Sequence, residues 1–487
     1  MLNIEDLFNE NFYLTRYPDV AAAVASGSVA SAFEHFQVFG QREERDPSAF
    51  FNSRYYREQN PDVAAASDRL ETALVEHFIA AGQLEGRNPT PLFDPNFYRQ
   101  QNPDVAAALD RDEITGLFVH YLQLGAREGR DPNPLVDSNF YLSQNPDVAV
   151  AVGEGITSAS EHFIELGQFE GRNPSSFFES NFYLSQNADI AEAAQRNETA
   201  ALEHFIEFGQ FEGRLPRTLF SEIYVFGDSL SDTGNLFREL AGFFPPSPPY
   251  FEGRLSNGPI WVEQLAPRLG LEFDSELNFA VAGATTGTVN ITNILFPILL
   301  PLPGLQVQVD EFAAANPSAD PNGLYVLWAG SNDYLDGGIT DIEISVNNLV
   351  NAANTLAAVG ARNLMVLNLS NLAASPRGSD SETGQSLGQL SNAHNAELAT
   401  ALTALEQNPN LNVISVDVNS LLNEAIANPQ SFGFTNVSDA FLDADGSDPN
   451  QFLFWDELHP TQPAHTLIAD RAVKAITRIP ELVSILL

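Results

Sequence analysis

The chain has 487 residues, with 64 acidic and 23 basic side chains, a formal net charge of −41 and no cysteine. A surface this acidic repels the phosphates of nucleic acids and the anionic face of a lipid bilayer, so we expect no nucleic-acid partner. The lack of cysteine excludes disulfides and every form of thiolate chemistry.

The first residues, MLNIEDLFNE, are acidic where a secretion signal would be basic, and no apolar core follows them. We therefore expect no amino-terminal secretion signal. The protein can then remain in the cytoplasm, or it can leave the cell by an export route that needs no such signal. We favour a location outside the cell or on its surface. No apolar run is long enough to span a bilayer, so we expect no transmembrane segment.

Residues 1–217 contain an internal repeat of 42 or 43 residues. Each copy begins with an FY-like pair followed by NPDV or a variant, and ends with an HF or HY pair, a glycine and a version of EGRxP. The five copies start at Phe12, Tyr55, Phe97, Phe140 and Phe182.

An asparagine precedes the proline of NPDV in three copies, at Asn60, Asn102 and Asn145. Such an asparagine can cap a helix whose first turn begins at the proline, and the later glycine can end another helix. We therefore predict a pair of helices in each copy. One pair cannot bury its aromatic face alone, so we expect the copies to stack into an all-α repeat array.

One histidine occupies the same position in every copy, at His35, His77, His120, His162 and His204. A shared metal is one hypothesis, but equivalent positions in separate units do not converge on a single ion. A repeated structural role is favoured. The repeats resemble modules of bacterial surface, secreted and polysaccharide-related proteins, which implies anchoring or assembly. Contact with a glycan or the cell surface is a further hypothesis.

Residues 218–487 show a different pattern, in which β-prone runs alternate with amphipathic helical stretches. This alternation predicts a separate α/β domain with a doubly wound, parallel, five-stranded sheet between two layers of helices. The predicted strands are residues 222–226, 277–281, 324–329, 363–369 and 412–417.

The first of these runs leads into a candidate nucleophile, Ser229, within the segment IYVFGDSLSDTGN. Reactive residues of parallel sheets gather at the carboxyl ends of strands, which is where this serine stands. A serine hydroxyl is a poor nucleophile at neutral pH, and it needs a base that is usually a histidine held by a carboxylate. The four letters GDSL alone favour an ordinary strand-to-loop turn, so the interpretation of Ser229 as a nucleophile depends on partner residues.

Partners for Ser229 stand in three later blocks. Asp456 and His459 in FWDELHPT are three residues apart, so a tight turn or a single helical turn places both on the same side and the carboxylate can fix the histidine tautomer. The negative charge that develops on an ester carbonyl needs preorganised donors. The sequence offers the backbone N–H of Ser229, the backbone N–H of Gly283 in NFAVAGATTG, and the side-chain amide of Asn332 in WAGSNDYL.

These four blocks resemble those of the GDSL esterase and lipase family, also called SGNH hydrolases. The resemblance covers the second predicted domain and implies a flavodoxin-like three-layer fold that uses no metal or organic cofactor. Larger members of this family often carry two cysteines before the last block, and this chain has none. The resemblance implies a nucleophile, a base, an orienting acid and two oxyanion donors at Ser229, His459, Asp456, Gly283 and Asn332.

The implied activity is hydrolysis of a carboxylic ester through an acyl-enzyme intermediate, with a small-molecule or lipid ester as substrate. The apolar run 291–305 can line an acyl pocket, form a lid or pack as a buried loop. We favour a lipid or medium-chain ester on the strength of this run. Two alternatives stay open: deacetylation of a polysaccharide, and a surface or scaffold protein whose hydrolase domain is inert.

Three other residues, Ser386, His394 and His465, have the side-chain type of a nucleophile or a base, but we do not assign them to the site. Ser386 stands in GQSLG, which matches the GxSxG pattern of α/β-hydrolases, but a polar loop precedes it where that motif needs a strand. His394 and His465 lie in segments with a helical pattern, and we expect them to have structural roles.

The acidic segment that holds Asp443, Asp445 and Asp448 resembles part of a calcium-binding loop. Position 454, where such a loop needs a glutamate, is a phenylalanine. We therefore interpret the segment as a solvated turn and keep calcium as the alternative.

Overall fold

The structure is a computed structural model that describes residues 1–196, 198–295, 301–379, 381–444 and 448–477. These residues divide into two compact units, Met1–Arg217 and a second unit that begins at Thr218. Among the described helices, none is both long and apolar enough to cross a membrane.

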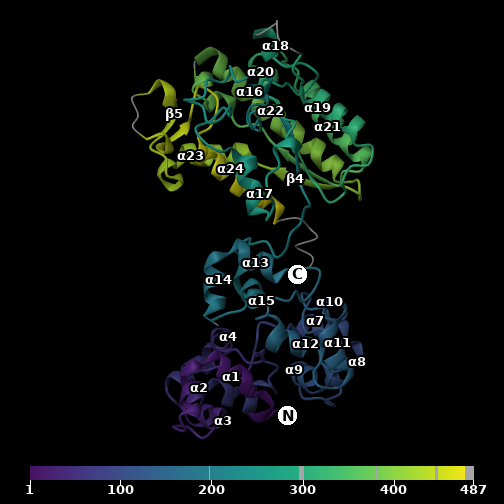
Figure 1. The fold of residues 1–487 in the computed structure, drawn as a ribbon, viewed down its shortest axis with the longest axis vertical. Coiled ribbons are helices and arrows are strands. Elements are labelled where there is room, and N and C mark those ends of the chain that lie inside the picture. Colours follow the sequence, from purple (N-terminus) through teal and green to yellow (C-terminus); the bar gives the residue numbers. More distant parts are fainter. Residues whose placement is uncertain (197, 296–300, 380, 445–447, 478–487) are drawn as a thin grey trace. The chain divides into compact units, whose positions relative to one another are not determined.

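Short helices make up the first unit, drawn from purple to blue in Figure 1. In each copy of the repeat, two α-helices are followed by a third that continues as a π-helical turn ending at a glycine. The region is helical as predicted, but each copy has three helical segments where we expected two.

The α-helices of the first unit are α1 (Glu10–Arg16), α2 (Pro18–Ala25), α3 (Ala32–His35), α4 (Ser53–Gln59), α5 (Pro61–Asp68), α6 (Leu74–His77), α7 (Pro95–Gln101), α8 (Pro103–Asp110), α9 (Leu117–His120), α10 (Ser138–Gln144), α11 (Pro146–Gly153), α12 (Ala159–His162), α13 (Ser180–Gln186), α14 (Ala188–Gln195) and α15 (Ala201–His204). The π-helical turns are Phe36–Gly40, Phe78–Gly82, Tyr121–Gly125, Phe163–Gly167 and Phe205–Gly209.

A buried tyrosine organises each copy, and the fourth copy shows how. The hydroxyl of the fully buried Tyr141 lies 2.9 Å from His162 Nδ1, and its ring packs edge-on against Phe163. A Cβ on Gly167 would lie 2.1 Å from the same hydroxyl, so only glycine leaves room for it. The helical segment ends at this glycine as predicted, and the close approach of the tyrosine hydroxyl is the reason that the position requires glycine. The other four copies repeat this arrangement.

The asparagines before the prolines do not cap helices with their side chains, contrary to our prediction. Asn60 precedes Pro61, the first residue of α5, but its Nδ2 donates to Tyr56 O at 2.7 Å. Its Oδ1 accepts from Arg87 at 2.8 Å. The side chain therefore joins two helices to the arginine of the EGR motif, which leaves it unable to serve the helix start. Asn102 and Asn145 make the same bonds.

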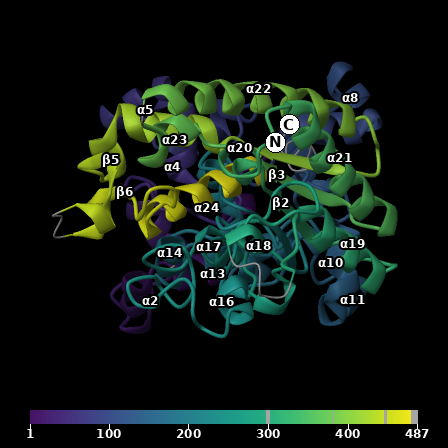
Figure 2. The same cartoon turned by 90° about the horizontal axis from the view of Figure 1, so that it is seen from above.

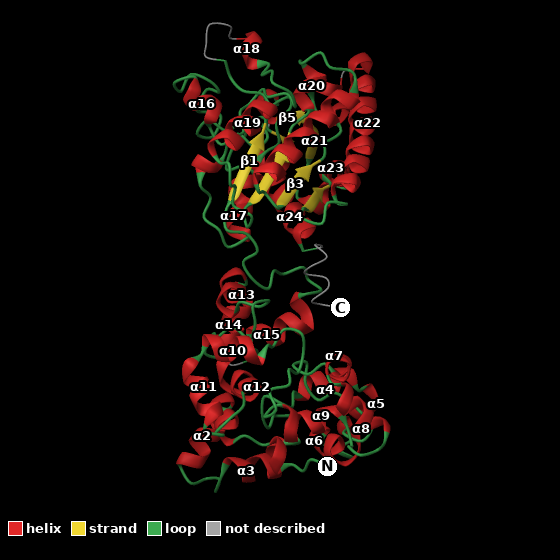
Figure 3. Cartoon of the chain, turned by 90° about the vertical axis from the view of Figure 1, so that its right-hand side faces the viewer, coloured by secondary structure: helices red, strands yellow, loops and turns green. Residues whose placement is uncertain are grey.

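In the described second unit, four parallel strands form the main sheet, in chain order (Figure 3). They are β1 (Ile223–Gly227), β2 (Leu324–Trp328), β3 (Asn363–Leu367) and β4 (Asn412–Val416). The parallel sheet is as predicted. The run 277–281, predicted as a further strand, makes only an isolated bridge between Asn278 and Val225.

Side chains explain why this run does not complete a strand. The N–H of Phe279 donates to Val225 O on β1 at 2.8 Å, as a strand would. On the other edge, Asn235 Nδ2 donates to the carbonyls of Asn278 and Ala280, at 2.8 Å each. The next donor of β1, the N–H of Gly227, bonds to Gln308 Oε1 at 2.9 Å. The ladder between the run and β1 therefore stops, and the described sheet has four strands, one fewer than predicted.

Helices cover both faces of this sheet (Figure 2). On one face, Phe226, Tyr325 and Leu364 pack against α19, α21 and α22 in one buried cluster. On the other face, Trp261 of α17 lies edge-on to Trp328 of β2, and α17 packs against α24. Apolar strands buried on both faces are what a doubly wound sheet requires.

The remaining α-helices are α16 (Asn235–Glu239), α17 (Trp261–Arg268), α18 (Thr292–Leu295), α19 (Leu305–Ala315), α20 (Ser331–Leu335), α21 (Ile342–Val359), α22 (Ser381–Leu405), α23 (Val418–Ala427) and α24 (Gln462–Ile476). Two short parallel strands, β5 (Asn436–Ala440) and β6 (Phe452–Phe454), form a separate small sheet.

Candidate active site

Ser229 lies just past the carboxyl end of β1, in the first turn of the loop. A Cβ on Gly227 would lie 2.3 Å from the carbonyl oxygen of Trp328, so glycine lets β1 end close against β2. The N–H of Asp228 donates to the same oxygen at 3.3 Å. The chain then turns away from the sheet and leaves Ser229 half-buried, at the wall of a cavity.

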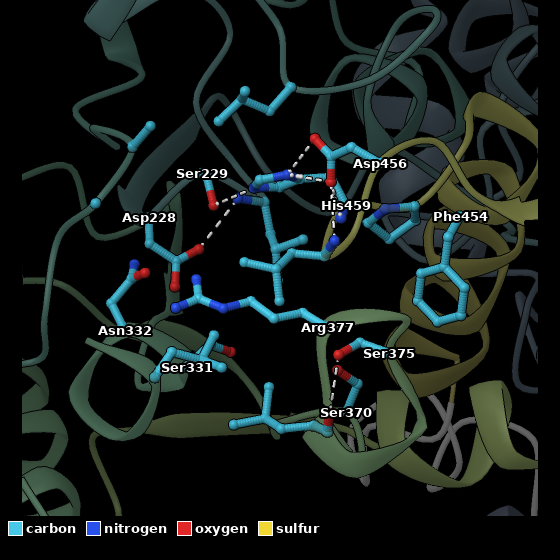
Figure 4. Close-up of a pocket in the computed structure, with 18 of the residues that line it drawn as sticks. Asp228, Ser229, Ser331, Asn332, Ser370, Ser375, Arg377, Phe454, Asp456 and His459 are labelled. Carbon is cyan, nitrogen blue, oxygen red and sulfur yellow. Dashed lines mark hydrogen bonds and ion pairs between the residues drawn. The ribbon is translucent and has the colours of Figure 1, made fainter. Parts of the chain in front are cut away.

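The structure brings Ser229, His459 and Asp456 together (Figure 4). Ser229 Oγ lies 2.9 Å from His459 Nε2. On the other side of the ring, His459 Nδ1 lies 2.8 Å from Asp456 Oδ2 and 2.9 Å from Oδ1. Residues from two distant blocks thus form one continuous chain of hydrogen bonds.

The tight turn predicted from the spacing of three is present after β6. Asp456 Oδ1 accepts the backbone N–H groups of Leu458 and His459 at 2.8 and 2.7 Å. The N–H of Trp455 donates to His459 O at 2.8 Å and closes the turn. The backbone therefore fixes both the carboxylate and the ring that it faces.

Burial and charge act in opposite directions on this pair. Burial opposes ionisation of Asp456, but His459 and the two backbone N–H groups outweigh it and lower the pKa of Asp456 to about 2. Burial also works against a charged His459, whereas Asp456 and then Asp228 favour it, so that the pKa of His459 is raised overall. The histidine is therefore a stronger base than a free imidazole, next to a carboxylate that stays ionised.

Asp228 differs from Asp456 although both carboxylates face the same histidine. It is 1% exposed, and burial raises its pKa to about 7 against the lowering effect of the Leu230 N–H, which donates to it at 3.0 Å. With fewer donors around it, this carboxylate is far easier to protonate than Asp456.

The predicted oxyanion donors line the same cavity as Ser229. Gly283 has a φ of +85°, and a Cβ there would lie 2.2 Å from Thr292 Oγ1, so both backbone and space require glycine. Asn332, 8% exposed, donates from Nδ2 to Ala284 O at 3.0 Å, which holds its amide toward the Gly283 segment. Figure 4 shows Asn332 and Ser229 at the wall of this cavity.

Two buried carboxylates that sequence reasoning missed hold these donors in place. Asp232 Oδ2 accepts the N–H of Ala282 at 2.8 Å, which ties the Ser229 loop to the Gly283 segment. Asp333 accepts from Thr286 N at 2.8 Å and from Ser345 Oγ at 2.8 Å. Both stand within the conspicuous blocks, but their polar neighbours along the chain do not distinguish them.

The cavity has a volume of about 280 Å³ and two kinds of wall. One wall is apolar and includes Leu236, Phe244, Leu255 and Ile291. Within the run 291–305, Ile291 and Thr292 line the cavity. Residues 296–300 lie outside the described residues, so the hypothesis that the run forms a lid stays untested.

The other wall is polar. Arg377 lies on it with Ser370 and Ser375 (Figure 4). The Arg377 guanidinium is paired with Asp336 at 2.7 and 3.0 Å. The Arg377 backbone N–H donates to Glu457 O at 2.9 Å, so this wall is attached to the turn that holds the histidine.

Ser386, His394 and His465, which we expected to lie outside the site, are not among the described residues that line the cavity. Ser386 is exposed on α22. His394, also on α22, is fully buried, with Nδ1 2.8 Å from the Tyr334 hydroxyl, and burial lowers its pKa to about 4. His465 on α24 is 1% exposed, and burial together with the charge of His459 lowers its pKa to about 3.

The calcium hypothesis depends on Asp445, which lies outside the described residues. Asp448 Oδ1 accepts the N–H of Asn450 at 3.0 Å, as the side chain at the start of a short turn does. Within the described parts of the chain, no group of three or more histidine, aspartate or glutamate side chains fits a metal ion.

Comparison with known proteins finds a matching family and several similar proteins. The model of a family described as GDSL-like Lipase/Acylhydrolase matches residues 223–472. Phosphatidylcholine-sterol acyltransferase of Aeromonas hydrophila is 32% identical over 224 residues, which cover 45% of this chain and 65% of that protein. Thermolabile hemolysin of Vibrio parahaemolyticus is 25% identical over 288 residues, 54% of this chain and 65% of the hemolysin.

A plant protein, GDSL esterase/lipase At5g45950 of Arabidopsis thaliana, is 27% identical and aligns with 53% of this chain and 88% of its own length. Among solved structures, a lipolytic G-D-S-L family member from Veillonella parvula aligns with 53% of this chain and 99% of its own, at 20% identity and a TM-score of 0.33. The chain spans less than two thirds of the acyltransferase and of the hemolysin.

Proposed function

The chain belongs to the GDSL-like lipase/acylhydrolase family, and from this premise we propose that it is a serine esterase or lipase that cleaves carboxylic esters through an acyl-enzyme intermediate. One observation carries the proposal. Ser229 Oγ, both nitrogens of His459 and the Asp456 carboxylate form an unbroken line of hydrogen bonds beside a cavity of about 280 Å³.

Attack on the ester begins with proton transfer. Neutral His459 accepts the proton of Ser229 through Nε2 while Ser229 Oγ bonds to the ester carbonyl carbon. Asp456 holds Nδ1–H, which leaves Nε2 as the acceptor, and its charge stabilises the imidazolium that forms. The raised pKa of His459 favours this transfer.

The carbonyl oxygen becomes negative in the tetrahedral intermediate. The N–H groups of Ser229 and Gly283 and the amide of Asn332 are the donors proposed to stabilise it, a role in which one donor contributes about 3–4 kcal/mol. His459 then returns its proton to the departing alkoxide and leaves the acyl group on Ser229. Water, deprotonated by the same histidine, releases the acid and restores the serine.

The two walls of the cavity support a lipid or medium-chain ester with a polar alcohol as substrate. The apolar wall suits an acyl chain, and the polar wall offers donors and acceptors to an alcohol portion. The Aeromonas relative is a phosphatidylcholine-sterol acyltransferase, and a lipid ester as substrate agrees with that name.

The described residues that line this cavity belong to the second unit. We therefore assign the first 217 residues an anchoring or assembly role, with a glycan or the cell surface as candidate contact. This assignment keeps deacetylation of a polysaccharide as the second substrate class. A cavity larger than an acetyl group and walled by leucine, isoleucine and phenylalanine favours the longer acyl chain.

A chain-length series tests the proposal. The full chain is mixed with p-nitrophenyl esters from acetate to palmitate and with acetylated xylan, and the adduct is trapped by acid quench and located by peptide mass spectrometry. We expect the highest kcat/KM at a medium chain length and an acyl adduct on Ser229. Hydrolysis of acetylated xylan alone would select the second class. No hydrolysis and no adduct would contradict an enzyme of either kind.

A further inference from the structure

Tyr250 reaches the Asp456 carboxylate from a distant part of the chain. Its hydroxyl donates to Asp456 Oδ2 at 2.9 Å, across 206 positions of sequence. Its ring lies edge-on to Trp455, with the ring centroids 6.2 Å apart. The same side chain lines the cavity together with Phe244 and Leu255. One residue thus contacts both the hydrogen-bond chain and the space for substrate.

The bonds around Asp456 show what Tyr250 adds. Oδ1 is held by two backbone N–H groups of its own turn, which set one end of the carboxylate. Oδ2 receives His459 Nδ1–H and, from outside the turn, the Tyr250 hydroxyl. Loss of that hydroxyl would leave Oδ2 with the histidine alone, so that rotation of the carboxylate would disturb the ring directly.

We propose that Tyr250 is a positioning residue for ester hydrolysis, and that it fixes Asp456 while its ring forms part of the substrate wall. The inference rests on the proposed function. A hydrogen bond to a carboxylate is stronger than one between neutral groups, and this one is partly buried. Tyr250 therefore acts through Asp456 on the orientation and basicity of His459.

The sign of the effect on His459 follows from the direction of the bond. The hydroxyl turns its positive end toward Asp456 and offsets part of the charge that stabilises protonated His459. Removal of the hydroxyl therefore raises the pKa of His459. Burial, followed by the charge of Asp456 and the bond to it, raises the pKa of Tyr250, so it stays a donor throughout the working range. The other titratable groups near this pair are Asp228, Asp443, Glu457 and His465.

Tyr250→Phe in the full chain tests the positioning role, because it keeps the ring and removes only the hydroxyl. We expect kcat on a p-nitrophenyl ester to fall about tenfold with KM unchanged, and the acidic limb of the pH profile to move to higher pH. Tyr224→Phe is the matched control, since its hydroxyl also bonds a carboxylate, that of Glu222 at 2.7 Å, near the start of β1. Equal kcat and an unmoved limb in Tyr250→Phe would overturn the proposal.

Tyr250→Leu separates the ring from the hydroxyl. It removes both, so we expect the same fall in kcat and in addition a rise in KM of about tenfold. An unchanged KM in this variant would overturn the part of the proposal that places the ring on the substrate wall.

A measurement of the His459 pKa without substrate tests the role of Tyr250 independently of the proposed function. The pKa of His459 is followed by proton NMR in the wild type and in Tyr250→Phe, with His459→Ala to assign the signal. A higher pKa in Tyr250→Phe supports the bond even if no ester is hydrolysed, an outcome that would contradict the function alone. An identical pKa in the two proteins contradicts the role of Tyr250.

Discussion

The two units of the molecule use histidine in different ways. In each copy of the repeat, the histidine Nδ1 lies 2.8 to 3.1 Å from a tyrosine hydroxyl, a neutral partner. In the second unit, His459 has a carboxylate at Nδ1 and the Ser229 hydroxyl at Nε2. Burial lowers the pKa of three repeat histidines, His120, His162 and His204.

The pKa of His459 is raised instead, because Asp456 outweighs the effect of burial. The difference teaches that a histidine becomes a base through a charge on one nitrogen and a nucleophile on the other. Burial and a hydrogen bond are common to both units and do not distinguish them.

Removal of the nucleophile is expected to have the largest effect. Ser229→Ala should lower kcat by about 10⁶-fold, because the other members of the set cannot act without it. Ser386→Ala, an exposed serine in a GxSxG pattern on α22, is the matched control and should keep full activity. The check is the steady-state rate on a p-nitrophenyl ester, and activity retained in Ser229→Ala would refute the assignment.

Removal of the charge on the orienting acid should make His459 resemble a repeat histidine. Asp456→Asn keeps the shape but loses the charge and the correct tautomer, so we expect kcat to fall by about 10⁴-fold. The same change at Asp448, which caps a short turn outside the cavity, should leave kcat unaltered. Similar rates for the two variants would contradict the role of Asp456.

Loss of one oxyanion donor should have an intermediate effect. Asn332→Ala removes the amide, and we expect kcat to fall by about 10²- to 10³-fold with little change in KM, since the donor acts on charge that develops during reaction. Asn351→Ala, at an exposed position on α21, serves as the control. A fall confined to KM would mean that Asn332 binds substrate only.

Changes in the repeats should alter stability and spare the chemistry. In Gly167→Ala, the new methyl group meets the Tyr141 hydroxyl, so we expect the first unit to lose about 1–3 kcal/mol of stability while kcat is unchanged. Gly153→Ala in the same copy meets nothing within 4 Å and should show no loss. Thermal unfolding and an ester assay on the same samples test this prediction. Equal unfolding curves for the two variants would contradict the claim that the Tyr141 hydroxyl requires glycine at position 167.

The pH profile offers the finest comparison between the units. Reaction needs neutral His459, so kcat/KM should rise with pH through the pKa of that residue. Since Asp456 raises this pKa, the midpoint should lie above the ordinary histidine value of about 6.5. Proton NMR of His120, His162 and His204 should give values below it. A midpoint below 6.5 would contradict the account of His459.

The fold was predictable where one element depends on its own residues. Four of the five predicted strands formed. In β1, β2 and β3 largely apolar runs are buried on both faces of the strand, whereas β4 buries only Ile414 and Val416. The remaining run, 277–281, did not complete a strand because the N–H of Gly227 on β1 bonds to the side chain of Gln308, 81 positions away in the sequence. Similarly, a glycine in each repeat is required by a tyrosine hydroxyl that only the folded copy brings near.

The site was predictable where chemistry demands a residue type. A serine needs a base, a base needs a carboxylate, and an oxyanion needs donors, so five positions could be chosen without a structure. Asp232, Asp333 and Tyr250 could not be chosen this way, because their bonds to the site cross 50, 47 and 206 positions of sequence. The residues next to them in the sequence do not indicate which distant groups they will bond.

The most direct test of the central claim is labelling with a fluorophosphonate, which reacts with activated serines, followed by peptide mapping of the full chain. The account predicts modification at Ser229 and its loss in His459→Ala, while Ser386 stays unmodified. Labelling at another serine, or none at all in a folded protein, would contradict the claim that Ser229, His459 and Asp456 form an active set.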